Sequence, residues 1–122
     1  ITGVAKAIKK VYEKVKVIGV EPAESPMITG GYKGSHGIQG IGAGFIPSIL
    51  DLSLIDEVMT VETKVAQAET RRLSEKGLFL GISSGAAIHA GYELLKKHGI
   101  DKKILVIAPD GGLKYLSTGI FD

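Results

Sequence analysis

Short apolar runs alternate along this chain with longer segments of helical periodicity. The apolar runs cover residues 15–20, 57–61, 78–82 and 103–109, and the helical patterns cover residues 2–14, 63–76 and 83–98. Strands that alternate with helices of ten or more residues predict parallel pairing with right-handed crossovers. We therefore expect an α/β fold of three layers, in which helices flank a mostly parallel sheet of four strands.

Each helical pattern places apolar side chains on one face. The faces consist of Val4, Ile8 and Val11 in the first helix, Ala66, Thr70 and Leu73 in the second, and Ile88, Tyr92 and Leu95 in the third. Thr63 is in a position to cap the second helix, and Gly77 and Gly99 follow the second and third helices, where glycine commonly ends a helix.

Glycine is concentrated in one stretch, GYKGSHGIQGIGAGF, which covers residues 31–45. The chain has 17 glycines in 122 residues, about twice the usual share. Long loops in compact domains are usually functional or mobile, and glycine lets the backbone approach a ligand closely. We therefore expect a binding loop here, and we expect its one histidine, His36, to be solvated.

The segment GISSG at residues 81–85 matches the G-x-S-x-G pattern of a hydrolase nucleophile elbow. In that fold the catalytic partners follow in the order Ser, acid, His. His89 and His98 both lie on the helix that follows Ser83, so this order cannot be assembled and the hydrolase interpretation is disfavoured. Two interpretations remain: a serine caps the helix, or Ser83 contacts a ligand while Ser84 provides the cap.

Ligands in parallel α/β sheets bind beyond the carboxyl ends of the strands. Ser83 follows the third predicted strand, and Pro109 and Asp110 follow the fourth. The glycine loop around Gly40 must also lie near a strand end. We therefore expect three segments that are distant in sequence to converge on one crevice.

Charge and composition disfavour several other classes of function. The net charge is +2 and no long basic run occurs, so we expect no nucleic-acid surface. The chain has no Cys and no close set of His, Asp and Glu, so we expect no metal site and a reducing compartment, the cytoplasm. No apolar run approaches the roughly 20 residues that span a bilayer, so we expect no membrane contact.

Six segments occur in an order and spacing that resemble a known family. They read VIGVEP, HGIQGIGAGFIP, IDEV, GLFLGISSGAA, ILVIAPD and KYLSTGIF. This chain is similar to the C-terminal part of cysteine synthase (O-acetylserine sulfhydrylase) and of its relative cystathionine β-synthase. Members of this family are pyridoxal-phosphate enzymes with a tryptophan-synthase-β-like fold, so the resemblance implies part of the large domain of such an enzyme.

The resemblance also implies site residues. Ser83 corresponds to the serine whose hydroxyl contacts the pyridine nitrogen of pyridoxal 5′-phosphate, and Pro109 to a residue that packs near the cofactor ring. Gln39 and Gly40 correspond to a loop that lines the substrate cleft. A neutral hydroxyl does not hold the ring nitrogen protonated as an Asp would, which suits β-replacement on a serine, or on a serine activated at its oxygen, by a sulfur nucleophile.

The family's Schiff-base lysine, substrate-carboxylate loop and phosphate loop correspond to positions before Ile1. The resemblance therefore implies that residues 1–122 are a single partial domain without a catalytic residue, inactive alone, and that the complete enzyme is a homodimer. Lys33 and Lys114 do not match the family lysine, and we expect both to be solvated.

Other points stay open at the level of the sequence. The tail PDGGLKY departs from the family pattern P-[DS]-S-G-x-R-Y, which leaves the sulfur donor and the leaving group undetermined. Two alternatives to a segment of an ordinary enzyme remain. One is a non-catalytic module that binds a small anion at the helix N-terminus after Gly81, and the other is one half of a split enzyme.

Overall fold

The sheet of this protein has two parallel strands, β1 (Ile18–Pro22) and β2 (Glu57–Val61). The computed structural model describes residues 1–122. Ile18 pairs with Glu57 and Pro22 with Val61, and backbone hydrogen bonds from Asp56 to Val17 and from Ala23 to Val61 continue the pairing at both ends. β-branched residues in both strands favour this extended conformation.

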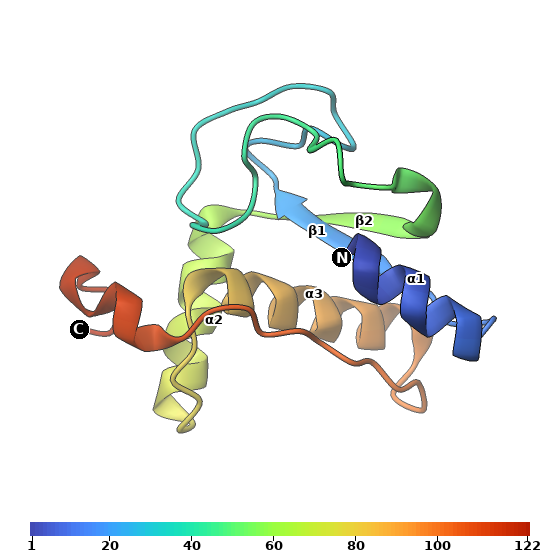
Figure 1. The fold of residues 1–122 in the computed structure, drawn as a ribbon. Helices are drawn as coiled ribbons and strands as arrows, with labels where there is room; N and C mark the ends of the chain where they lie inside the picture. The colour runs from blue at the N-terminus through green and yellow to red at the C-terminus, as the bar shows by residue number, and fades with distance from the viewer.

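Helices α2 (Thr63–Glu75) and α3 (Ile82–His98) lie together on one side of the strands (Figure 1). They cross most closely at Gly85, where an added Cβ would lie 2.7 Å from the Ala66 carbonyl oxygen and would collide with the Thr70 hydroxyl. The Thr70 hydroxyl donates to the Ala66 carbonyl oxygen at 2.9 Å and lies 3.2 Å from that of Gly81. A glycine at residue 85 therefore permits this helix crossing.

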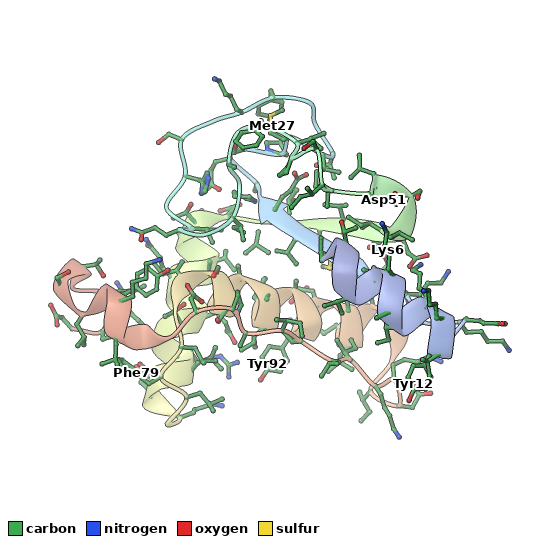
Figure 2. The ribbon with its side chains drawn as sticks, in the orientation of Figure 1. Lys6, Tyr12, Met27, Asp51, Phe79 and Tyr92 are labelled. Carbon is green, nitrogen blue, oxygen red and sulfur yellow. The ribbon has the colours of Figure 1, made fainter.

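The buried core lies where α2, α3, the glycine loop and the end of the chain meet. Its residues are Ile38, Val61, Ala66, Ile82, Ala86, Ala90, Tyr115 and Ile120. The buried part of α3 is made of small residues near its start, and Tyr92 lies 43% exposed on the side away from the strands (Figure 2). The apolar face that the helical pattern indicated for α3 is therefore not the face that packs into the core.

Helix α1 (Thr2–Val11) packs against the short 3₁₀ helix η1 (Leu52–Leu54), and the Thr2 hydroxyl accepts a hydrogen bond from the Asp51 amide at 3.1 Å. Only Ala5 of α1 is buried. Val4 is 57% exposed and Val11 is 72% exposed. The amphipathic pattern predicted the helix correctly, but its apolar face is uncovered by the rest of this chain.

Two of the four predicted strands do not form. Residues 78–82 make one antiparallel bridge, between Leu80 and Gly111, before α3 begins at Ile82. Residues 103–109 run beside α3 without any backbone hydrogen bond (Figure 1). No strand of this chain lies next to residues 103–109, so this apolar segment has no neighbouring strand with which to form backbone hydrogen bonds. The α/β class is confirmed, with a parallel sheet that is smaller than expected.

Residues 23–56 connect the two strands without an α-helix. Most of this connection lies on the side of the sheet opposite α3 (Figure 1), but the glycine-rich part reaches the start of α3 at Ile38 and Gly40. Gly40, Gly42 and Gly44 have positive φ angles, of 95°, 63° and 79°. Other residue types rarely adopt such angles, which explains the glycines of this loop. The chain ends in a 3₁₀ helix, η2 (Gly112–Thr118). None of the helices is both long and apolar enough to cross a membrane.

Candidate functional site

The N-terminus of α3 is capped by a carboxylate from a distant part of the chain. The amides of Ser83 and Ser84 donate to the Asp110 carboxylate at 3.2 and 2.8 Å. An ionised acceptor at a helix N-terminus also interacts favourably with the helix dipole. The prediction that a serine provides the cap is therefore wrong: neither serine side chain accepts an amide hydrogen bond from the first turn of α3.

The two serine hydroxyls have different environments. The Ser84 hydroxyl is fully buried and donates to the Asp110 carboxylate at 2.5 Å, while the Asp110 amide donates to it at 3.1 Å. The Ser83 hydroxyl has no hydrogen-bond partner in the chain, although Ser83 is only 5% exposed. A Cβ added at Gly40 would lie 3.7 Å from the Ser83 hydroxyl oxygen, so the glycine loop passes over this group.

The glycines of GISSG have packing roles. A Cβ at Gly81 would collide with the Asp110 carboxylate and would lie 2.5 Å from the ring of Tyr115, and Gly85 lies at the crossing with α2. No histidine bonds to Ser83, because His36 is engaged elsewhere and His89 and His98 follow on α3. The match to the hydrolase pattern therefore reflects close packing, and no catalytic triad is present.

Asp110 and Tyr115 form a hydrogen-bonded pair beneath this helix start. The Tyr115 hydroxyl donates to the Asp110 carboxylate at 2.6 Å. Burial and the bond to Asp110 raise the pKa of Tyr115 to about 12. Burial acts to raise the pKa of Asp110, but hydrogen bonds from the Ser84 hydroxyl, the Tyr115 hydroxyl and the Ser84 amide outweigh it and hold that pKa below its usual value. The carboxyl is therefore ionised and the phenol neutral at pH 7.

The glycine loop is fixed by hydrogen bonds on both sides of Gly40. The His36 Nε2 donates to the Gly42 carbonyl oxygen at 2.8 Å, and its Nδ1 accepts from the Ile38 amide at 3.2 Å. The Thr63 hydroxyl accepts from the Gly37 amide at 2.8 Å, and Ile38 is fully buried. His36 thus stabilises the conformation of the loop through both ring nitrogens. The expectation that it is simply solvated is wrong, because the residue is partly buried.

Thr63 does not cap α2 with its side chain, as the sequence suggested. Its amide donates to the Glu24 carboxylate at 2.7 Å, and its hydroxyl is engaged with the glycine loop. Burial acts to raise the pKa of Glu24, but hydrogen bonds from the Thr63 amide and hydroxyl outweigh it and hold that pKa below its usual value. The starts of α2 and α3 are therefore both held by carboxylates that lie far away in the sequence.

The structure brings together some of the residues that the sequence singled out. Ser83 and Gly40 face each other, and Gln39 is exposed on the same loop beside Gly40. Pro109 is exposed and directly precedes Asp110. Tyr115 received no role from the sequence, because no local pattern indicates that its hydroxyl bonds to Asp110, the carboxylate that caps α3. Asp110 was recognised as lying at a strand end but not as a helix cap.

The two loop lysines contact other parts of the surface. Lys114 is exposed, with its Nζ 5.7 Å from the centre of the Tyr115 ring. Lys33 is exposed, and its side chain lies beside Gly44, 3.5 Å from an added Cβ there. Both lysines are therefore solvent-accessible, as expected from the sequence.

Comparison with protein-family models finds a match to the family described as "Pyridoxal-phosphate dependent enzyme" over residues 1–110. Ser83, Gly40 and Asp110 lie within the matched residues, and Tyr115 lies after them.

Individual relatives give the same result. The chain is 48% identical over 121 residues to cysteine synthase B of Campylobacter jejuni, covering 99% of this chain and 40% of that protein. It is 39% identical over 122 residues to a cysteine synthase of Staphylococcus aureus, covering 99% and 39%. Among solved structures, a cysteine synthase (OASS) of Entamoeba histolytica superimposes with a TM-score of 0.93 at 43% identity, covering 98% of this chain and 36% of that one. The chain thus spans about two fifths of the curated relatives it matches.

Proposed function

Since this chain belongs to the family of pyridoxal-phosphate-dependent enzymes and resembles cysteine synthases, we propose that it forms the C-terminal part of an enzyme that replaces the β-substituent of a serine. The amino-acid substrate is serine or a serine activated at its oxygen, and the incoming group is a sulfur nucleophile. Residues 1–122 are one partial domain of that enzyme, and the complete enzyme is a homodimer.

The Ser83 hydroxyl is the observation that carries this proposal. It is nearly buried, has no partner in the chain and lies at the start of α3, opposite Gly40. Because the hydroxyl oxygen is not closed off from solvent, it is free to bond to a ligand that enters the site. The residues present therefore fit the nitrogen side of a pyridine ring, and a neutral hydroxyl is chemically suited to it. Pyridoxal phosphate, when bound, supplies an electron sink for the substrate carbon.

Other residues of the chain shape the surroundings of this hydroxyl. Gly40 leaves space in front of Ser83, because a larger side chain there would approach the hydroxyl. Gln39, exposed beside it, is positioned to contact a polar group of the substrate. Pro109 precedes the Asp110 cap and offers an apolar ring at the same helix start. We assign Ser83 and Pro109 to the cofactor and Gln39 and Gly40 to the substrate cleft.

The isolated chain is proposed to be inactive. Lys33 lies beside Gly44 and Lys114 lies over the Tyr115 ring, and both are exposed. We assign neither of them the role of the cofactor lysine. Pyridoxal phosphate added to the chain alone, followed by borohydride reduction and peptide mapping, should give no specific labelled lysine. Mixing the chain with a fragment that carries the rest of the enzyme tests the split-enzyme alternative.

The small-anion module is the less favoured alternative. The amides of Ser83 and Ser84 already donate to the Asp110 carboxylate, so a free anion would have to displace that carboxylate. The group at this site that remains available to hydrogen-bond a ligand is the Ser83 hydroxyl instead.

Substitution of Ser83 in the complete enzyme tests the proposal. Ser83→Ala should retain bound cofactor but lower kcat/KM by about tenfold, the effect of one hydrogen bond to the ring. Ser83→Asp should lower kcat/KM further, because a carboxylate would hold the ring nitrogen protonated. Ser117→Ala, at an exposed serine of η2, is the matched control. Wild-type turnover in both Ser83 variants would show that this residue does not contact the cofactor.

A further inference from the structure

The Asp110 carboxylate is saturated with hydrogen bonds. It accepts from the Ser83 amide at 3.2 Å, the Ser84 amide at 2.8 Å, the Ser84 hydroxyl at 2.5 Å and the Tyr115 hydroxyl at 2.6 Å. A carboxylate offers about four acceptor positions. Asp110 therefore has no acceptor position left for the Ser83 hydroxyl, although it already accepts from the Ser83 amide.

Tyr115 provides the donor that completes this set. Its side chain is 1% exposed and belongs to the same core cluster as Ile82 and Ile120. Its ring lies against Gly81, where no side chain could be accommodated. The raised pKa of Tyr115 keeps its hydroxyl protonated, and the lowered pKa of Asp110 keeps the acceptor ionised. The donor and the acceptor are thus fixed by packing as well as by charge.

We propose that Asp110 and Tyr115 are positioning residues, which together keep the Ser83 hydroxyl turned toward the cofactor side of the helix start. This inference rests on the proposed function, in which that hydroxyl meets the pyridine nitrogen. Without the Tyr115 hydroxyl, one oxygen of Asp110 retains only the long bond from the Ser83 amide. That oxygen then competes for the Ser83 hydroxyl, and the contact with the cofactor ring weakens.

Cofactor affinity provides a test that does not depend on turnover. In the complete enzyme, freed of cofactor, Kd is measured for pyridoxal phosphate and for the analogue in which carbon replaces the ring nitrogen. The parent enzyme should prefer pyridoxal phosphate by about fivefold, the effect of one ordinary hydrogen bond. Ser83→Ala should abolish this preference, and Tyr115→Phe should reduce it to about twofold while the phenyl ring preserves the packing.

A double-mutant cycle then separates positioning from general damage. If Tyr115 acts through Ser83, Tyr115→Phe should have no further effect on the preference once Ser83→Ala is present. Tyr92→Phe, at an exposed tyrosine of α3, is the matched control and should keep the parental preference. Asp110→Asn, which retains the shape of the side chain, is a second variant and should lose the preference as Ser83→Ala does.

The outcomes distinguish the two proposals. If Ser83→Ala keeps the parental preference, Ser83 does not contact the ring nitrogen, and both the proposed cofactor contact and its positioning fail. If Ser83→Ala abolishes the preference but Tyr115→Phe weakens both cofactors equally, Tyr115 is merely structural and only the positioning role is overturned. A preference that falls in Tyr115→Phe and Asp110→Asn, with no further fall in the double variant, supports the inference.

Discussion

Asp110 and Tyr115 hold the start of α3 by a charge-assisted hydrogen bond. This bond accompanies a lowered pKa at Asp110 and a raised pKa at Tyr115. The pKa of Asp110 is lowered, so its contribution to stability is present above the usual Asp range and is lost as the pH falls below it. The pKa of Tyr115 is raised to about 12, so its contribution is present below pH 10 and is lost as the pH rises toward 12. The helix start is therefore stable across the whole neutral range.

The titration of Tyr115 can be observed directly. The difference between the ultraviolet tyrosinate titrations of the chain and of its Tyr115→Phe variant should be centred near pH 12. Burial and the nearby Asp110 charge both oppose ionisation, and the exposed Lys114 ammonium over the ring is too screened by solvent to reverse this. A difference curve centred near pH 10, the ordinary value for tyrosine, would contradict the buried hydrogen bond.

At the same scale, the sequence singled out Ser83 as the serine whose hydroxyl is not used in a cap, but it did not indicate what caps the helices. Ser83 stood out because two adjacent serines cannot both be needed for one cap. The caps themselves come from the carboxylates of Glu24 and Asp110. Along the sequence, these residues lie 39 and 26 positions from the residues whose amides donate to them. Capping rules describe residues adjacent to a helix, so no local pattern could indicate these long-range carboxylates.

The crossing of α2 and α3 is the element-scale feature that depends most on a single residue. Gly85→Ala should destabilise the chain by about 1–3 kcal/mol, since the new Cβ would meet the Ala66 carbonyl and the Thr70 hydroxyl in a packed helix interface. Gly3→Ala in α1 is the control, because nothing lies within 4 Å of an added Cβ there. It should be neutral or stabilising by up to about 1 kcal/mol, from helix propensity.

Urea unfolding followed by circular dichroism measures both free energies of unfolding. Equal stability of Gly85→Ala and the parent chain would mean that the two helices cross further apart than the structure shows.

At the scale of elements, periodicity predicted all three α-helices and the strand at residues 57–61. It failed for residues 103–109, because an apolar run indicates burial in a sheet only if a neighbouring strand exists. Here Val106 packs on Gly91 of α3, while Leu105 is 81% exposed. The pattern also failed to give the buried face of α3, because the crossing with α2 selected small residues such as Gly85 and Ala86 over larger apolar ones.

For the whole molecule, the main consequence is uncovered apolar surface. Val11 and Tyr12, at the end of α1, lie beside Leu105, and together with neighbouring lysines they line one surface hollow. A second exposed apolar region contains Phe45, Ile46 and Ile49 of the long loop. Contiguous apolar surface of this kind marks contact sites or aggregation-prone regions. It agrees with a chain that spans about two fifths of its curated relatives.

We therefore expect the 122-residue chain to self-associate when it is prepared alone. Sedimentation velocity should show a weight-average mass that rises with concentration from the 12.8 kDa of one chain. A variant with Val11→Lys and Leu105→Lys should reduce this association, whereas Lys102→Glu, at an exposed position near the hollow, should not. A concentration-independent monomer that binds no hydrophobic dye would contradict this expectation.

The distant cap of α3 also imposes an order of events during synthesis. A polypeptide leaves the ribosome N-terminus first, at about 5–20 residues per second. Residues 82–98 therefore emerge before Asp110 and Tyr115, and until then their first amides lack the carboxylate that they bond in the folded chain. Ser83 receives its final orientation only when residues 110–115 fold back onto Gly81. A ribosome that stalls or a protease that cuts before Asp110 would thus leave the first amides of α3 without their carboxylate partner.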